Sequence, residues 1–187
     1  MRQLVVDQLK QRGVEIDDIA VIVYQLQAPY HASLTHGECR ESVLRVLEKR
    51  EVQHAVFTGI ALDVMAEERR LPEPLQTIMD EDEPLYGVDE VLALAVTNVY
   101  GSIGLTNFGY LDKTKLGVIG KLNDDRGHIH VFLDDLVASL AASAAARIAH
   151  QHEAKSYQRA DSSAPAKGDN EVPESPEGEM VNGDSST

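Results

Sequence analysis

Two apolar stretches, VDEVLALAVTNVYG (residues 88–101) and HVFLDDLVASLAASAAARIAH (residues 130–150), decide the fold of this chain. Each is apolar around most of a helical circumference, which is typical of a helix enclosed by other helices. The first predicts a helix over 88–100 in the middle of a bundle. The second predicts a helix over 131–149, whose alanine-rich second half allows neighbouring helices to approach closely.

Apolar residues also recur at helical spacing in the first 85 residues. We expect helices over 3–12, between Asp17 and Pro29, from Thr35 to Leu47, over 52–68 and, as a short piece, within 71–85. Thr35 and Glu38 form the Thr-x-x-Glu capping box that marks a helix start. Gly59 lies inside the fourth helix, where glycine is unfavourable, so we expect a close contact with another helix there.

No segment shows the sustained alternation of a strand, so the sequence predicts an all-α fold. We expect a compact multi-helix bundle around a central apolar helix. After residue 150 the composition changes to serine, acids, glycine and proline without apolar periodicity. The prediction is therefore a helical domain over 1–150 and a disordered acidic tail over 151–187.

The charge balance excludes some classes of partner. Asp and Glu number 31 against 17 Lys and Arg, a net charge of −14, whereas nucleic-acid binding needs a basic face. The same charge opposes docking on anionic lipid, and no apolar stretch reaches the roughly 18 residues that span a bilayer. Cys39 is the single cysteine, which fits a reducing compartment. We expect a cytoplasmic protein with at most peripheral membrane contact.

Acidic residues stand at the ends of the two apolar stretches. Asp89 and Glu90 begin the first, and Asp134 and Asp135 lie in the first turn of the second. Such acids often only complement the helix dipole. Adjacent helical residues point about 100° apart, however, so two acids in an apolar stretch cannot easily both avoid the interior. A buried ionised carboxylate needs a cation or strong hydrogen bonds.

The segment GSIGLTNFGYLDKTKLG (residues 101–117) joins the two apolar stretches and adds a fifth carboxylate, Asp112. Its glycines predict a loop between helices, which is also able to bring backbone N–H groups to a phosphate. Lys113 and Lys115 are the nearest cations to Asp112. Either one holds a phosphate as a point charge, or both lie on the surface.

The ligand types in this region favour magnesium. Carboxylate oxygens are preferred by Mg²⁺, which keeps waters for a substrate phosphate, and no cysteine set suggests Zn²⁺. His128 and His130 are a candidate pair of metal ligands, but their polar, glycine-containing flanks predict histidines of a loop. The cofactor we expect is therefore Mg²⁺.

Three patches together resemble the phosphatidylglycerophosphatase A family. They are Asp89-Glu90 at the start of an apolar helix, FGYLDKTK (residues 108–115), and LDDLVA (residues 133–138). Along nearly all of residues 10–150 the chain is similar to the soluble, all-helical branch of this family found in Gram-positive bacteria.

The resemblance implies a Mg²⁺-dependent phosphatase that converts phosphatidylglycerophosphate to phosphatidylglycerol, or acts on a related phosphomonoester. It implies metal-binding or acid/base roles for five carboxylates and phosphate contact for Lys115. Among the five we expect Asp112 and Asp135 to take part in catalysis. The complete predicted metal-binding set is Asp89, Glu90, Asp112, Asp134 and Asp135.

A second hypothesis stays open. Apolar, alanine-rich helices serve an oligomer interface as readily as a monomer core, so the chain is alternatively a non-catalytic helical interaction module. In that case the acids are helix caps that point to separate surfaces. Under either hypothesis we expect a homo-oligomer.

Overall fold

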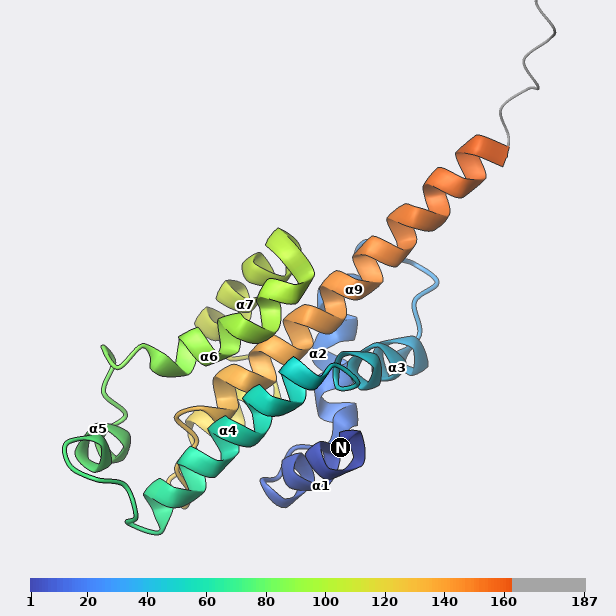
Figure 1. Ribbon diagram of the computed structural model, residues 1–187. Helices are drawn as coiled ribbons and strands as arrows, with labels where there is room; N and C mark the ends of the chain where they lie inside the picture. Colours follow the sequence, from blue (N-terminus) through green and yellow to red (C-terminus); the bar gives the residue numbers. More distant parts are fainter. Residues whose placement is uncertain (163–187) are drawn as a thin grey trace, which may run out of the picture.

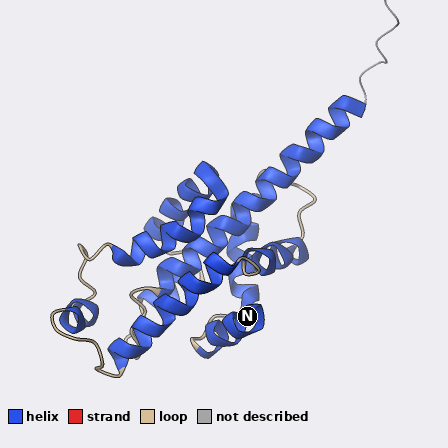
Figure 2. Ribbon diagram, viewed as in Figure 1, coloured by secondary structure: helices blue, strands red, loops and turns tan. Residues whose placement is uncertain are grey.

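A computed structural model describes the backbone of residues 1–162 and the side chains of residues 1–154. All regular elements in this part of the chain are helical, which confirms the predicted all-α class (Figure 2). They are α1 (Arg2–Gln11), α2 (Ile16–Gln27), α3 (His36–Val46), α4 (Arg50–Glu67), α5 (Leu75–Glu81), α6 (Val88–Thr97), the short 3-10 helix η1 (Asn98–Tyr100), α7 (Gly101–Thr114), α8 (Val118–Asn123) and α9 (Leu133–Ser162).

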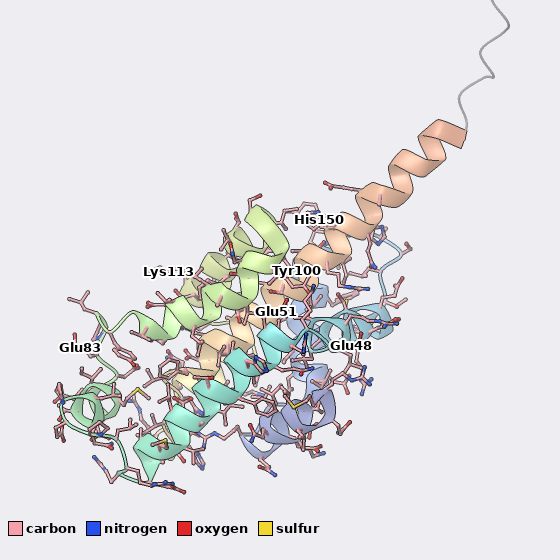
Figure 3. The ribbon with its side chains drawn as sticks, in the orientation of Figure 1. Glu48, Glu51, Glu83, Tyr100, Lys113 and His150 are labelled. Carbon is pink, nitrogen blue, oxygen red and sulfur yellow. The ribbon has the colours of Figure 1, made fainter. Side chains whose placement is uncertain are left out.

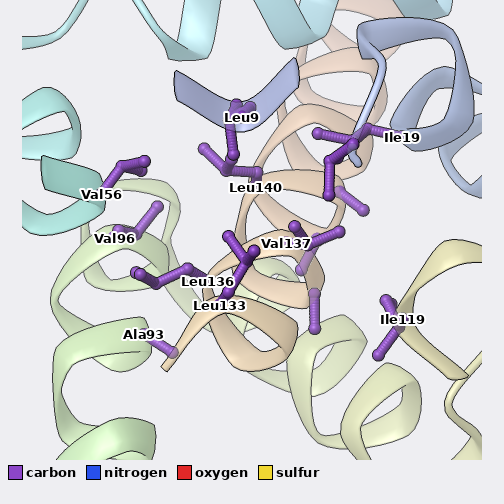
Figure 4. Packing of buried hydrophobic residues seen from close by; sticks show 14 of the residues in the cluster. Leu9, Ile19, Val56, Ala93, Val96, Ile119, Leu133, Leu136, Val137 and Leu140 are labelled. Carbon is purple, nitrogen blue, oxygen red and sulfur yellow. The ribbon is translucent and has the colours of Figure 1, made fainter. Parts of the chain in front are cut away.

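Helix α9 is the central helix of the bundle, and the other long helices pack around its first half (Figure 1). Residues 131–146 of the chain are buried without interruption. Figure 4 shows side chains of α9 packed against those of surrounding helices. The residues labelled there from α9 are Leu133, Leu136, Val137 and Leu140, and the labelled neighbours include Leu9, Ile19, Val56, Val96 and Ile119.

The alanines of α9 explain why it occupies the centre. Ala141, Ala142, Ala144 and Ala145 are fully buried, and α2, α3 and α7 all contact this helix. Small side chains keep the helix narrow, so several neighbours reach it at once while each still buries its own apolar face. A serine hydroxyl of α3, on Ser42, donates to the carbonyl of Ala144 at 2.9 Å within this contact.

The first apolar stretch does not have the central place that its composition predicts. Helix α6 buries Ala93, Val96 and Thr97 against α9 but exposes Val91 and Leu94. A helix that is apolar on all sides is normally buried on all sides. Helix α6, however, packs against the rest of the bundle on one side only, so its other side stays exposed. The bundle therefore has a central apolar helix, as expected, but that helix is α9 and not the helix over 88–100.

The glycine-rich segment is not a loop. Gly101 and Gly117 have positive φ angles of 70° and 60°, and between them Gly101–Thr114 form helix α7. Inside α7, Gly104 permits close packing, because an added Cβ would lie 3.1 Å from the carbonyl oxygen of Thr97. Glycine in this segment thus marks the ends of a helix and one tight contact within it.

Residues 88–114 form a hairpin, in which α6 and η1 lead into α7 and α7 runs back beside α6 (Figure 1). Among the described residues, Val88–Thr114 is the one segment whose length and composition would suit a membrane-crossing helix. The prediction that no stretch reaches this length is wrong for that segment. The turn at Gly101 divides it into arms of 10 and 14 residues, about 15 and 21 Å long, which are shorter than the ~30 Å of a hydrocarbon core.

Helix α4 contacts α9 closely at Gly59. A Cβ added there would lie 2.4 Å from Cδ1 of Leu136 and 2.9 Å from Cβ of Phe132. The expected close helix contact at Gly59 is therefore confirmed, and its partner is the first turn of α9. The capping box at the start of α3 is also confirmed, since Thr35 and Glu38 each bond the other's backbone N–H.

Helix boundaries depart from the predictions in three places. Helix α2 begins at Ile16, slightly before the predicted start at Asp17, with Glu15 as N-cap and Asp18 accepting from the Glu15 N–H at 3.0 Å. Helix α8 arises in a segment for which no helix was predicted. Helix α9 continues past residue 150 to Ser162, and the rest of the predicted tail, 163–187, lies outside the described residues.

Candidate functional site

The start of α9 is held by a buried acid of α4. The carboxylate of Asp63, which is 0% exposed, accepts hydrogen bonds from the backbone N–H groups of Phe132 and Leu133, each at 3.0 Å. These N–H groups have no partner inside the helix, so Asp63 caps α9 from a neighbouring helix. The cap fixes the position of the next two residues, Asp134 and Asp135, which are 7% and 4% exposed.

The first turn of α6 brings two further acids to the same region. Gly87 has a positive φ of 67°, which lets the chain turn sharply into α6 and places Asp89 and Glu90 in its first turn. One ligand oxygen each of Asp89, Glu90 and Asp135 lies within 4.8 Å of the other two. Carboxylates of two helices thus meet in one place, and both helices start there.

Lys115 completes the site from the end of α7. It has left-handed backbone angles, φ 47° and ψ 51°, and its N–H bonds the carbonyl of Leu111 at 2.7 Å. Its Nζ donates to Asp112 at 2.8 Å, to Asp134 at 2.9 Å and more distantly to Asp135 at 3.4 Å. Of the two predicted phosphate-binding lysines, Lys115 therefore lies in the site, whereas Lys113 is exposed.

The five predicted carboxylates all converge, in two groups that share Asp135. One group is Asp89, Glu90 and Asp135, and the other is Asp112, Asp134 and Asp135 around Lys115. We call these five residues the carboxylate cluster. Their individual roles in metal binding and catalysis stay predictions.

Negative charge is in excess in the carboxylate cluster, and the pKa values reflect it. Burial, together with the neighbouring charge of Asp134, raises the pKa of Asp135 to about 8. Burial and the charge of Asp89 also raise the pKa of Glu90. Burial would lower the pKa of Lys115, but the charge of Asp134 and its hydrogen bond to Asp112 outweigh burial and raise it. One lysine thus stays charged among five acids and does not balance them.

The donor set fits a hard divalent cation. Oδ1 of Asp89 is shielded from solvent and has no hydrogen-bond partner, which is costly for a carboxylate oxygen. It belongs to the group of three carboxylates within 4.8 Å, and oxygen ligands of this kind are those that Mg²⁺ binds. Asp89, Glu90 and Asp135 would hold the ion, with Asp112 and Asp134 beside it.

A second group of ionisable side chains surrounds the loop before α9. Arg12, the residue that ends α1 as its C-cap, donates to both carboxylate oxygens of Glu67, at 3.0 and 2.6 Å, and to the carbonyl of Ile129 at 2.8 Å. Asp125 bonds His128 at 2.9 Å and His130 at 3.3 Å. We call these residues the arginine cluster: Arg12, Glu67, Asp125, His128 and His130.

The hydrogen bonds of the arginine cluster leave His130 without a free ligand atom. Nη2 of Arg12 lies 3.1 Å from Nδ1 of His130, and because a guanidinium only donates, Nδ1 accepts. The ring proton is then on Nε2, where it faces Asp125. Burial and the Arg12 charge lower the pKa of His130, which keeps the ring neutral. The loop interpretation of His128 and His130 therefore fits the geometry, although Asp125 and the two rings lie close enough together for a metal.

Sequence reasoning missed two of the residues that shape this region. Asp63 lies one helical turn after Gly59 and Ile60, on the side of α4 that faces the core. An acid in line with core residues predicts a buried carboxylate that binds a specific partner. Arg12 carries no such signal, because its partner Glu67 is 55 residues away in the sequence. Only the packing of α1 against α4 brings the two together.

The fold and the site define a class: an all-helical protein with a carboxylate-rich site at the start of its central helix. A family model for phosphatidylglycerophosphatase A matches residues 6–150, which include the whole carboxylate cluster. The chain belongs to the phosphatidylglycerophosphatase A family.

Proteins of Bacillus subtilis and Listeria monocytogenes are similar to this chain in sequence, and two of them match it in solved structures. The Bacillus subtilis protein YpjQ is 58% identical over 147 residues, covering 79% of this chain and 83% of YpjQ, and B. subtilis YutG is 56% identical over 144 residues, covering 76% and 87%. The crystal structure of YpjQ matches with a TM-score of 0.79 at 56% identity, over 82% of this chain and 96% of that one. The low temperature requirement C protein of Listeria monocytogenes also matches at 0.79 and 56%, over 81% and 96%.

Proposed function

We propose that the protein is a Mg²⁺-dependent phosphatase that hydrolyses the terminal phosphate of phosphatidylglycerophosphate or of a closely related phosphomonoester. The observation that carries the proposal is the meeting of Asp89, Glu90 and Asp135 within 4.8 Å, beside a lysine that contacts Asp112 and Asp134. The alternative, a non-catalytic module, predicts acids on separate surfaces. Their convergence favours the enzyme.

The reaction adds water across a phosphate ester. A water oxygen forms a bond to phosphorus and gives up a proton to a carboxylate, the bond from phosphorus to the ester oxygen breaks, and the departing alkoxide takes a proton to become the alcohol. Bound Mg²⁺ supplies charge neutralisation for the phosphate oxygens and the leaving oxygen. We assign the proton transfers to Asp112 and Asp135. Burial raises the pKa of Asp135 to about 8, which suits acid/base work near neutral pH.

Lys115 is placed to hold the substrate phosphate. Its ammonium group already binds carboxylate oxygens from two helices, and a phosphate oxygen offers the same kind of acceptor. The positive end of α9 points into the same space, since Asp134 and Asp135 lie in its first turn. Lysine and helix dipole together favour an anion at a place where five carboxylates would otherwise repel it.

We also propose that the protein acts in the cytoplasm. Cys39 is a free and fully buried thiol. A buried free thiol fits a compartment in which disulfides do not form. Fractionation of cells followed by detection of the chain in the soluble and membrane fractions tests this assignment.

The test of function is phosphate release from phosphatidylglycerophosphate in mixed micelles and from glycerol 3-phosphate in solution, each with Mg²⁺ and with a chelator. We expect Mg²⁺-dependent release that the Asp135→Asn variant loses. Release from the lipid alone would identify the substrate, and release from both would indicate a general phosphomonoesterase. Absence of release from either, in protein that Mg²⁺ stabilises against heat, would contradict the proposal.

A further inference from the structure

The hairpin of residues 88–114 carries a long segment without any ionisable side chain. Residues 91–111, VLALAVTNVYGSIGLTNFGYL, contain no Asp, Glu, Lys, Arg or His, in a chain with 31 acids and 17 Lys and Arg. An uncharged segment of this length would be unremarkable in a buried core. Here, however, only 28% of the corresponding apolar window is buried.

The exposed side of the hairpin is rich in apolar side chains. Eleven large apolar residues are exposed in the part of the chain that the structure describes, and seven of them lie between Leu85 and Tyr110. Val91 is 63% exposed, Leu105 is 41% exposed and Tyr110 is 51% exposed. Both arms pack against α9, and Val91 and Leu105 are exposed on the sides of the arms away from it. Tyr110 lies at the edge of this surface, where it lines a cleft with Tyr30 and His31. We call this surface the uncharged face.

Charged groups surround the uncharged face but stay off it. Figure 3 places Tyr100 at the far end of the hairpin, near His150 and Glu51, and Lys113 at the other end. The contacts agree, because Nζ of Lys49 lies 5.6 Å from the Tyr100 ring and His150 contacts the Tyr100 carbonyl at 3.4 Å. Depletion of charge in the centre with charge at the rim is the pattern of a protein–protein interface.

We propose that the uncharged face binds the same face of a second copy of this chain. A chain with a net charge of −14 repels its own copies, so self-association requires a surface from which charge is absent. A two-fold pairing sets the same patch against itself and needs no complementary charge. Two hairpins pairing in this way form a layer of four helices, with Val91 and Leu105 in their contact.

A lipid surface fits the uncharged face less well. Helices that lie on membranes carry lysine or arginine on their flanks and large aromatic or leucine side chains on the inserted side. The hairpin carries a single basic residue, Lys113, at one end, and its exposed side chains include Asn98, Ser102 and Thr106. Amide and hydroxyl groups can hydrogen-bond across a protein interface, whereas in hydrocarbon they would be costly.

The test is the mass of the full chain in solution, measured by light scattering and by sedimentation over a wide concentration range. We expect twice the 20.5 kDa of one chain for the parent protein. Val91→Glu and Leu105→Glu should each give a single-chain mass, because a charge would be buried between two copies. The matched controls, Val21→Glu on α2 and Leu4→Glu on α1, change equally exposed residues outside the hairpin and should keep the doubled mass.

Circular dichroism establishes that each variant is folded, so that a change of mass reports the interface. A parent protein of 20.5 kDa at all concentrations would overturn the proposal. A doubled mass that survives both hairpin substitutions would also overturn it.

Flotation with phosphatidylcholine and phosphatidylglycerol vesicles adds one further outcome. A single-chain parent that binds vesicles, and loses them with Val91→Glu, would assign the face to lipid instead. None of these results depends on phosphatase activity.

Discussion

The carboxylate cluster and the arginine cluster both lie near the start of α9, and both contain partly buried ionisable groups. In the arginine cluster every acid has a basic or N–H partner: Glu67 binds Arg12, and Asp125 binds the Gly127 N–H and two histidines. In the carboxylate cluster five acids share Lys115, and an oxygen of Asp89 has no partner at all. A charge-balanced group stabilises the fold, whereas an unbalanced group is suited to bind a cation.

The pKa values make the same distinction. Although burial alone would raise it, hydrogen bonds from Arg12 and the Ile129 N–H hold the pKa of Glu67 below its ordinary value. The Gly127 N–H and His128 lower the pKa of Asp125 to about 2. In the carboxylate cluster burial raises the pKa of both Asp134 and Asp135. The fold therefore stabilises ionised acids in one place and disfavours them in the other.

The largest expected difference between the clusters is in activity. Asp135→Asn should reduce Mg²⁺-dependent phosphate release by about a hundredfold or more, because it removes a carboxylate assigned to proton transfer. Asp125→Asn, the same chemical change in the arginine cluster, should leave the turnover of the folded protein unchanged. Steady-state phosphate release by the two variants measures this. Equal losses would show that the arginine cluster also contributes to catalysis.

The next largest difference is in stability. Arg12→Met should lower the free energy of unfolding by about 3 kcal/mol, since it leaves the partly buried Glu67 carboxylate and the Ile129 carbonyl without their donor. Arg2→Met removes an exposed ion pair with Glu48, in which both side chains are 40% or more exposed, and should cost less than about 1 kcal/mol. Urea denaturation of both variants supplies the comparison. A loss no greater for Arg12→Met than for Arg2→Met would contradict a structural role for Arg12.

In the absence of metal, removal of one acid should have opposite effects in the two clusters. Asp135→Asn should raise the stability of the metal-free protein by on the order of 1 kcal/mol, because a repelling carboxylate disappears. Asp125→Asn should lower it, because hydrogen bonds to the Gly127 N–H and the histidines weaken. Thermal melts in a chelator measure both.

The same melts repeated with Mg²⁺ should give a higher melting temperature for the parent and for Asp125→Asn. A ligand that binds only the folded state stabilises that state. Asp135→Asn should show a reduced rise or none. A rise of the same size in Asp135→Asn and in the parent would place the metal elsewhere.

The smallest expected effect is an opposite dependence on pH. The folded-state pKa of Asp135, about 8, lies above its unfolded value, so the folded protein binds more protons between about pH 4 and pH 8. Its contribution to stability therefore falls as the pH rises through this range. His130 has a lowered pKa, so the unfolded protein binds more protons below about pH 6.5 and stability falls as the pH decreases.

Metal-free melts across this range should separate the two residues. The advantage of Asp135→Asn over the parent should grow with rising pH. The deficit of His130→Asn should shrink as the pH falls below about 6.5, where the parent loses the benefit of a neutral ring. Differences that do not change with pH would mean that neither group titrates in the folded protein.

The carboxylate cluster could be anticipated from sequence because its members occupy helix ends. Two pairs of acids stand in apolar stretches that must be buried: Asp89 with Glu90, and Asp134 with Asp135. Because a buried carboxylate needs a cation or hydrogen bonds, these acids are expected to lie in a shared polar site. The family resemblance singled out Lys115, but the residues by themselves did not separate it from Lys113. The choice between them depends on the left-handed backbone of Lys115, which turns its side chain back toward Asp112 and α9. The arginine cluster could not be anticipated either, because its partners lie far apart in the chain.

The sequence by itself determined the all-helical class, the capping of α3, the close contact at Gly59 and the acids of the site, because periodicity, caps and buried charge are local properties of the chain. Only the tertiary structure decided which apolar helix is central. Helices α6 and α9 are both apolar enough, but the alanines of α9 let more neighbours reach it. Helix α6 therefore lies at the surface and carries part of the uncharged face. The burial of a helix depends on how many other helices pack against it, and not on its own composition alone.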